Sequence, residues 1–301
     1  MDWLTLNSDS EQVVFGIFFL VLSGLLFPLF AVVITVLHSK TYHSPNLTYT
    51  LMSMILITEL IQVICHFVTS PIFIFPGLQE SLACVISILG NILNSAWIFE
   101  FPATTILAVC RVLIFTDIMT SQKMHVVLKI LILLITIVLL FIAVISYQFK
   151  IFISCPPGWK YDQSAPYTLS FQFLEFSIVI PCLVINYVSY LAIAFLIYQK
   201  KRGSTVHSRR NELEILIQYT LLTIYTTISI VAWHKGVLWF DKEDVKVQAF
   251  INAMWIVECA FNPMLTLVLS RSIREECLRA IRKMSSSEDD HHIFAFAIYH
   301  H

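Results

Sequence analysis

Long apolar stretches alternate with short polar segments along the whole chain. Each apolar stretch can cross a hydrocarbon core of about 30 Å as a helix, which takes about 20 residues. Strands with open edges would leave backbone groups unpaired in lipid, so helices are expected. The pattern predicts an all-α membrane protein, a bundle of seven transmembrane helices at roughly 13–37, 47–75, 83–116, 126–149, 167–198, 213–233 and 247–269.

The charges of the polar segments predict the orientation of the bundle. With the N-terminus outside, 14 of the 19 Lys and Arg residues fall on the cytoplasmic side and 5 on the other. Positive residues favour the cytoplasmic side of a membrane. We therefore expect an extracellular N-terminus in a multi-pass protein of the plasma membrane.

Composition supports a single membrane domain. Hydrophobic residues make up 57% of the chain, mean hydropathy is +0.78, and charged residues are 13%, against about 25% in soluble domains. We expect one domain over 1–283 and a disordered cytoplasmic tail over 284–301, with the first stretch kept as an uncleaved span. The sequence contains no Gly-rich phosphate loop, HExxH or GxSxG motif, so we expect no enzyme, cofactor, metal site or nucleic-acid partner.

A short amphipathic helix is expected after the last span, over 270–283. Ile273, Cys277, Leu278 and Ile281 recur at helical spacing with cations between them, as in helices that lie on the inner leaflet. Cys277 is a candidate for acylation there. A free cytoplasmic thiol is the alternative.

Several short motifs resemble those of rhodopsin-like G-protein-coupled receptors. Asn262-Pro263-Met-Leu-Thr266 stands where that family has Asn-Pro-x-x-Tyr, Arg111 ends the third span, and Pro181 lies in the fifth. The short loops, Gly90…Trp97, Cys110-Arg111 and Ser270-x-x-Ile-Arg274 are most similar to nematode serpentine chemosensory receptors. The resemblance implies an external small-molecule ligand and a heterotrimeric G protein as partners.

Cys84 and Cys155 are expected to form a disulfide. Both face the outer, oxidising side in the predicted topology. They also match the family disulfide that ties the third helix to the second outer loop.

The resemblance assigns coupling and activation roles to Arg111, Asn262, Pro263 and Thr266, but the motifs depart from the family pattern. Arg111 follows Val-Cys instead of an acid, Thr266 replaces a tyrosine, and the sixth span has Trp233 but no proline. Arg111 either snorkels to lipid headgroups or contacts the G protein, or helix six when the receptor is shut.

Residues in the outer halves of three spans, most of them polar, are candidates for ligand binding. Family members place ligands among such positions, while interhelical hydrogen bonding is the alternative role. The candidates are Asn91, Asn94, Ser95 and Ile98 in the third span, Gln172 and Glu175 in the fifth, and Asn252 and Trp255 in the seventh.

Three acids are candidates for a buried acidic cluster near midmembrane. Glu59, Glu100 and Glu258 lie in the second, third and seventh spans, where ionisable groups usually face the interior. Three nearby carboxylates cannot all stay ionised cheaply, so such a cluster would hold protons, a sodium ion or both. Separate protonated acids bonded to neighbours are the alternative.

The sequence favours a chemosensory receptor over two other classes of seven-span protein. A ligand-gated channel subunit of the odorant-receptor type would have the inverted orientation, against the charge asymmetry. A transporter is expected to show internal repeats, and none is visible. The resemblance alone extends the prediction to a sensory neuron and its cilium, and the oligomeric state stays open.

Overall fold

The computed structural model describes residues 4–43, 47–116, 118–119, 126–199, 206–239, 244–271, 273–279 and 282, with side chains left out at 43, 206–212 and 235–239. The predicted tail over 284–301 and residues 272, 280, 281 and 283 of the predicted amphipathic helix lie outside this range.

Seven of the helices are long and apolar enough to cross a membrane, which confirms the predicted fold class. The spans agree closely with the hydropathy pattern, and the largest difference is in the first, which runs Ser10–Tyr42. The helices are α1 (Ser10–His43), α2 (Leu47–Thr69), α5 (Ala83–Phe115), α6 (Val126–Gln148), α7 (Thr168–Gln199), α8 (Val206–Trp239) and α9 (Val245–Leu269), with short α3 (Pro71–Ile74) and α4 (Gly77–Ser81) at the outer end of span two.

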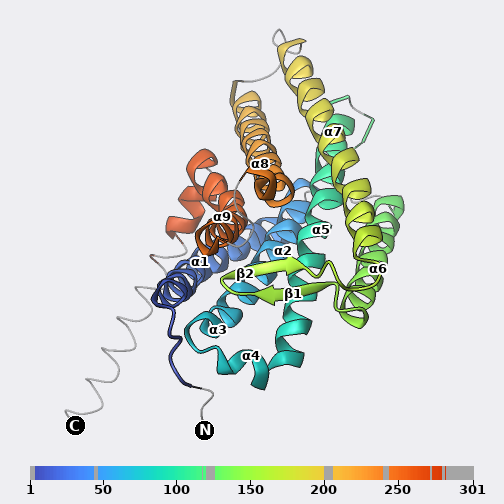
Figure 1. The fold of residues 1–301 in the computed structure, drawn as a ribbon. Helices are drawn as coiled ribbons and strands as arrows, with labels where there is room; N and C mark the ends of the chain where they lie inside the picture. Colours follow the sequence, from blue (N-terminus) through green and yellow to red (C-terminus); the bar gives the residue numbers. More distant parts are fainter. Residues whose placement is uncertain are drawn as a thin grey trace, which may run out of the picture.

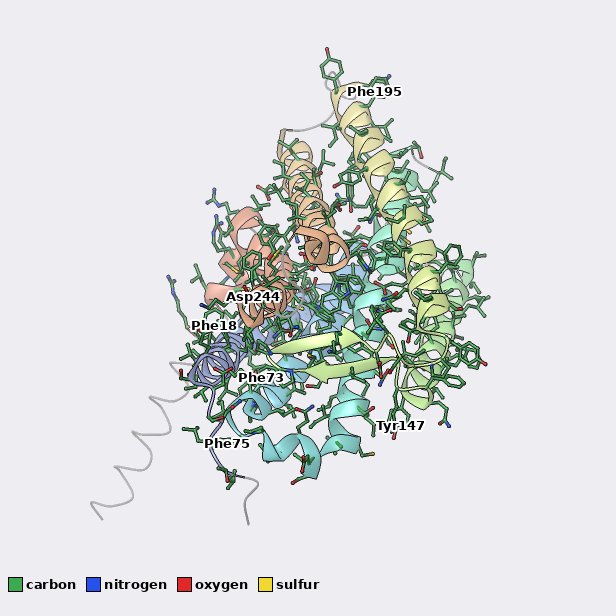
Figure 2. The ribbon with its side chains drawn as sticks, viewed as in Figure 1. Phe18, Phe73, Phe75, Tyr147, Phe195 and Asp244 are labelled. Atoms are coloured by element: carbon green, nitrogen blue, oxygen red, sulfur yellow. The ribbon has the colours of Figure 1, made fainter. Side chains whose placement is uncertain are left out.

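Helix α5 is the centre of the bundle, in contact with α2, α6 and α7. Helix α9 packs against α1, α2 and α8 and closes the other side (Figure 1). Figure 2 shows apolar side chains standing out around the bundle, Phe18 and Phe195 among them. An apolar exterior fits lipid, which is as apolar as these side chains.

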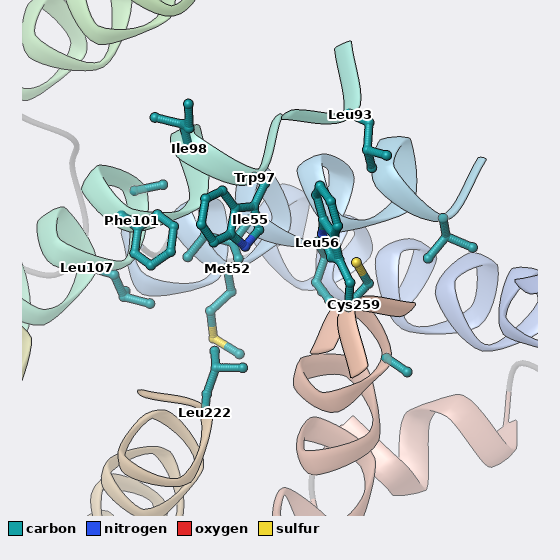
Figure 3. Close-up of a cluster of buried hydrophobic side chains, with 14 of the residues drawn as sticks. Met52, Ile55, Leu56, Leu93, Trp97, Ile98, Phe101, Leu107, Leu222 and Cys259 are labelled. Carbon is teal, nitrogen blue, oxygen red and sulfur yellow. The ribbon is translucent and has the colours of Figure 1, made fainter. Parts of the chain in front are cut away.

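The interior is filled by apolar side chains at helical spacing on facing helices. Met52 of α2 reaches toward Leu222 of α8, and Trp97 and Phe101 of α5 lie edge to face with ring centroids 5.0 Å apart (Figure 3). This core fixes the rotation of each helix and decides which polar residues face the centre.

A β-hairpin crosses the outer end of the bundle, an exception to the all-α prediction. Strands β1 (Phe152–Cys155) and β2 (Gly158–Tyr161) pair antiparallel, and the turn points toward α9 (Figure 1). One face of the hairpin carries Phe152, Trp159 and Tyr161, all buried, as strand alternation predicts.

Trp159 packs the hairpin against α5 at Gly90. A Cβ atom on Gly90 would lie 2.3 Å from Trp159 Cζ3, so only glycine leaves room for the indole. At the turn, a Cβ on Gly158 would lie 3.6 Å from Asn252 Cβ of α9. Packing therefore holds the hairpin over the bundle.

The predicted Cys84–Cys155 disulfide is wrong for this structure, in which both thiols are free. Cys84 Sγ lies 3.6 Å from the Tyr147 hydroxyl of α6, while Cys155 Sγ lies 3.8 Å from Gln248 Oε1 of α9. With Trp159 packed on Gly90, the hairpin turn points toward α9. Cys155, which lies at this turn, is therefore far from Cys84 at the start of α5.

Residues 273–279 are helical, as expected of the segment after span seven. Ile273 and Cys277, one turn apart, are buried, and Lys40 Nζ of α1 lies 2.8 Å from Glu276 Oε1. This helix therefore packs on the bundle. Cys277 is only 3% exposed, so its thiol does not face lipid as acylation would require.

Candidate ligand cavity and internal polar network

A cavity of about 290 Å³ lies under the hairpin at the outer end of the bundle. Its walls come from β2 and the adjoining loop, α7, α8 and α9. Gln172 and Asn252, two of the predicted ligand residues, are part of the lining. The other lining residues are Trp159, Lys160, Tyr161, Gln163, Trp233, His234, Gln248 and Ile251.

Glu175, also predicted, lies behind this cavity and joins three elements. It is 1% exposed, its Oε2 accepts a hydrogen bond from the Tyr161 hydroxyl of the hairpin, and its Oε1 lies 3.2 Å from His234 Nε2 of α8. The Tyr161 hydroxyl also lies 3.2 Å from Asn94 Oδ1 of α5. Burial and the neighbouring carboxylate both raise the pKa of Tyr161, so the tyrosine stays neutral and donates.

A second, smaller cavity of about 20 Å³ lies against the same Trp233 and Ile251. Asn94, Ser229 and Glu258 belong to its lining, and the Glu258 carboxyl interacts with the Ser229 hydroxyl. One water fits such a volume when it has two to four polar partners. The cavity therefore has room for a single water between α5, α8 and α9.

Besides Glu175, three predicted ligand residues line neither of these cavities. Asn91 Nδ2 donates to the Ser87 carbonyl at 2.7 Å, Ile98 is 1% exposed within the apolar core, and Ser95 Oγ is buried. The hairpin covers this part of α5, because Trp159 packs on Gly90 and Tyr161 bonds Asn94. Asn94 and Trp255 line the inner cavity.

A chain of hydrogen bonds begins at Trp255, which lines the second, inner cavity. Trp255 Nε1 donates to Gln62 Oε1 at 2.8 Å, and Gln62 Nε2 donates to Glu100 Oε2 at 3.3 Å. The residues are buried and belong to α9, α2 and α5. Hydrogen bonds between spans in this low-dielectric interior fix the helices relative to one another.

The same polar layer continues toward the inner side through Asn262 and Thr266. Asn262 Nδ2 donates to Glu59 Oε1 at 3.0 Å. Gln218 Nε2 of α8 donates to Asn262 Oδ1 at 2.8 Å and to Thr266 Oγ1 at 2.7 Å. Pro263 lies inside α9 between these two residues. Gln218 thus bonds to the hydroxyl that stands in place of the family tyrosine.

Glu59, Glu100 and Glu258 share one level of the bundle and interact electrostatically in all three pairs. Each acid nevertheless has its own neighbours: Asn262 for Glu59, Gln62 for Glu100, and Thr226 for Glu258. Within the described ranges, no group of three or more His, Cys, Asp or Glu residues is arranged to hold a metal ion. Occupation of the cluster by protons or a sodium ion stays a prediction.

Arg111 points into the bundle. It is 5% exposed, and its charge acts on the hydroxyls of Tyr190 in α7 and Tyr219 in α8. A snorkelling side chain would reach the headgroups, so that alternative is wrong for this conformation. Tyr219 belongs to α8, the sixth span, so the charge of Arg111 acts on helix six, and a link to helix six in the shut state stays a prediction.

The family model for the serpentine type 7TM GPCR chemoreceptor Srt matches residues 3–290. The chain belongs to this family. It is therefore a multi-pass membrane protein of a chemoreceptor family, which confirms the predicted resemblance. A comparison with curated proteins found no match.

Sequence reasoning missed Trp159, Tyr161, His234 and Gln218. The alternation of Phe152, Trp159 and Tyr161 on either side of Pro156-Pro157 was the available signal for a hairpin. The face of α8 that carries Gln218 could not be fixed from the sequence, because that span is apolar on several sides.

Proposed function

We propose that this protein is a chemosensory G-protein-coupled receptor that detects an external small molecule in the outer cavity. The observation that carries the proposal is the position of this cavity directly over the polar network. Trp233 belongs to both cavities, and Trp255 belongs to the inner cavity and to the hydrogen-bond chain. A ligand under the hairpin would touch α8 and α9, the two helices that Gln218 joins farther in.

Signalling follows as a shift between two arrangements of α8. In the resting arrangement, Gln218 holds α8 to Asn262 and Thr266, and the charge of Arg111 acts on Tyr219 of α8. A ligand that fits better when Trp233 has moved favours an arrangement in which these contacts are broken. The inner ends of α5 and α8 then become available to a heterotrimeric G protein.

The proposed setting is the plasma membrane of a sensory neuron and its cilium, with the N-terminus outside. Support comes from the family, the seven spans and the distribution of cations. In this orientation the hairpin and its cavity face the exterior.

The test is a screen of small molecules on cells that express the receptor with a promiscuous Gα subunit. We expect responses that disappear when Trp233→Ala is introduced and persist in Phe195→Ala, a change on the lipid-facing side. The same cells are then loaded with GDP-β-S, which blocks G-protein activation. A ligand-gated current that survives this block would replace the receptor proposal with the channel alternative.

A further inference from the structure

We propose that the outer cavity binds a short extended peptide, which adds a strand to the open edge of β2 and places an acidic residue opposite Lys160. The inference deepens the proposed function by naming the class of ligand, and it rests on that function for its biological role. The peptide site itself follows from the hairpin and the cavity walls.

The outer cavity runs along one edge of β2. Trp159, Lys160 and Tyr161 all line it, although neighbouring residues of a strand point to opposite faces. A cavity that touches three consecutive residues therefore follows the edge of the strand. The other edge of β2 is paired with β1, and Figure 1 shows β2 as the strand on the side of α8. The cavity thus borders the edge that β1 leaves open.

The register of the hairpin decides which backbone groups point out of this open edge. Asp162 N donates to the Ile151 carbonyl at 2.8 Å, and hydrogen-bonded pairs alternate with non-bonded pairs in an antiparallel ladder. Lys160 therefore bonds to Ile153 of β1, while the backbone N–H and C=O groups of Trp159 and Tyr161 point away from β1. Among the described residues, none of these four groups has a hydrogen-bond partner.

An open strand edge is a template for a further strand, and extended peptides bind proteins in this way. A ligand residue opposite Trp159 can exchange two hydrogen bonds with it, and the residue two positions away can do the same with Tyr161. Three ligand residues therefore satisfy all four groups. The cavity volume of about 290 Å³ lies at the lower end of ligand pockets, which limits the peptide to about this length.

The hairpin also predicts the side chains at the first and third positions of the peptide. They lie on the same face as Trp159 and Tyr161, the face that is buried against the bundle. Trp233 is edge to face with Tyr161 there, with ring centroids 6.4 Å apart at 83°. Pairs of aromatic and β-branched residues stabilise neighbouring strands. We therefore expect valine or isoleucine at both positions.

The middle residue of the peptide lies opposite Lys160, on the exposed face of the hairpin. Lys160 is exposed and forms no ion pair among the described residues. Asp162, on the same face, already accepts hydrogen bonds at Oδ1 from the backbone N and the hydroxyl of Ser164. Opposite charges directly across two strands attract and like charges repel. An acidic middle residue is therefore preferred over a basic one.

The probe is acetyl-Val-Glu-Val-amide, added to the purified full-length protein. One analogue carries N-methyl groups on both valines, which removes the N–H groups that point to β2. The other carries an N-methyl group on the glutamate, whose N–H points away from β2. Because each lost hydrogen bond weakens binding, we expect the first analogue to bind at least about ten-fold more weakly in calorimetry and the second within about three-fold of the parent.

A charge exchange locates the middle residue. Lys160→Glu is expected to weaken binding of acetyl-Val-Glu-Val-amide about five-fold and to strengthen binding of acetyl-Val-Lys-Val-amide by a similar factor. The gain for the second peptide also shows that the variant is folded. Lys150→Glu is the matched control, since it reverses an exposed outer charge that does not line the cavity, and it should leave both affinities unchanged.

Hydrogen exchange measures the register independently. The backbone N–H groups of Trp159 and Tyr161 should exchange more slowly when the peptide is bound, because they then donate to it. The N–H of Lys160 already donates to Ile153 and should change least. Slower exchange at Lys160 alone would contradict the pairing.

Several outcomes would overturn the assignment. Equal loss of affinity in the two N-methyl analogues would contradict strand pairing, a loss only in the glutamate analogue would contradict the register, and no binding of any peptide would refute the ligand class. These measurements use no G protein. Peptide binding without any cellular response would contradict the proposed function and leave the ligand assignment intact, while cellular responses to other small molecules without peptide binding would do the reverse.

Discussion

Gln218 is the residue that most directly joins α8 to the Asn-Pro segment of α9. Its amide nitrogen donates both of its hydrogens across the helix interface, to Asn262 and Thr266. Thr266 is too short for a tyrosine's reach, and Gln218 spans the gap from the opposite helix. The family contact is thus rebuilt with a different pair of side chains.

Gln218→Leu keeps the approximate size of the side chain and removes both bonds. Each is worth about 0.5–1.5 kcal/mol, so we expect basal G-protein signalling to rise roughly five-fold or more. Second-messenger production without ligand, normalised to surface level, measures this. Thr220→Val is the control, because the Thr220 hydroxyl donates to the Leu216 carbonyl of its own helix. Unchanged basal signalling in Gln218→Leu would refute the role of Gln218 as a restraint.

Arg111 lies at the inner end of α5 with its charge buried between α7 and α8. Arg111→Ala should abolish ligand-driven signalling, because in the proposed active state the released Arg111 cation contacts the G protein. Surface level should remain near normal. Lys129→Ala on the exposed face of α6 removes a cation from the same side of the membrane and should leave signalling intact. Normal signalling in Arg111→Ala would show that the side chain serves packing only.

Among the secondary-structure elements, the seven spans could be predicted from the sequence and the hairpin could not. A bilayer sets both the length and the composition of a spanning helix, so hydropathy alone located all seven. Helix rotation depends on which partners pack against each face. Asn94 lines a cavity while Asn91 and Ser95, on nearly the same face, do not. The position of the hairpin depends on Gly90 and Trp159, which lie far apart in the sequence.

The cysteine pairing also depended on packing that the sequence does not reveal. Topology placed Cys84 and Cys155 on one side of the membrane, and it could not supply their lateral positions. The hairpin turn reaches α9, while Cys84 faces Tyr147 of α6. The role expected of a disulfide is instead filled by the packing of an indole on a glycine.

Gly90→Ala tests this packing. The added Cβ would lie 2.3 Å from Trp159 Cζ3, so the hairpin must move. We expect reduced surface expression and a lower melting temperature of the purified protein, since overpacking typically costs about 1–3 kcal/mol. Gly24→Ala is a matched control in α1, where the new Cβ would lie 3.4 Å from Phe67 Cε2, an ordinary contact.

The double variant Gly90→Ala with Trp159→Leu should recover much of the lost melting temperature, because the shorter side chain leaves room for the methyl group. If the double variant is as unstable as Gly90→Ala alone, or if Gly24→Ala is equally harmful, Gly90 is not a specific seat for the hairpin.

The whole molecule has two different ends. The N-terminal segment lies at the end that carries the hairpin, with Asn7 N bonded to the Ile74 carbonyl at 2.9 Å. The segment after α9 lies at the opposite end and packs on α1 through Lys40 and Glu276. The outer cavity belongs to the first end and the buried Arg111 to the second. A ligand from outside can reach the cavity only if the first end is extracellular.

Orientation is therefore the property on which the receptor proposal depends most. A tag at the N-terminus should stain in intact cells, and a tag at the C-terminus only after permeabilisation, because 14 of the 19 cations then lie in the cytoplasm. Exchanging the tags between the termini controls for differences in antibody access. Staining of the C-terminal tag alone in intact cells would place the hairpin inside the cell. That orientation is the one expected of the channel class, and the cavity could then no longer sense an external molecule.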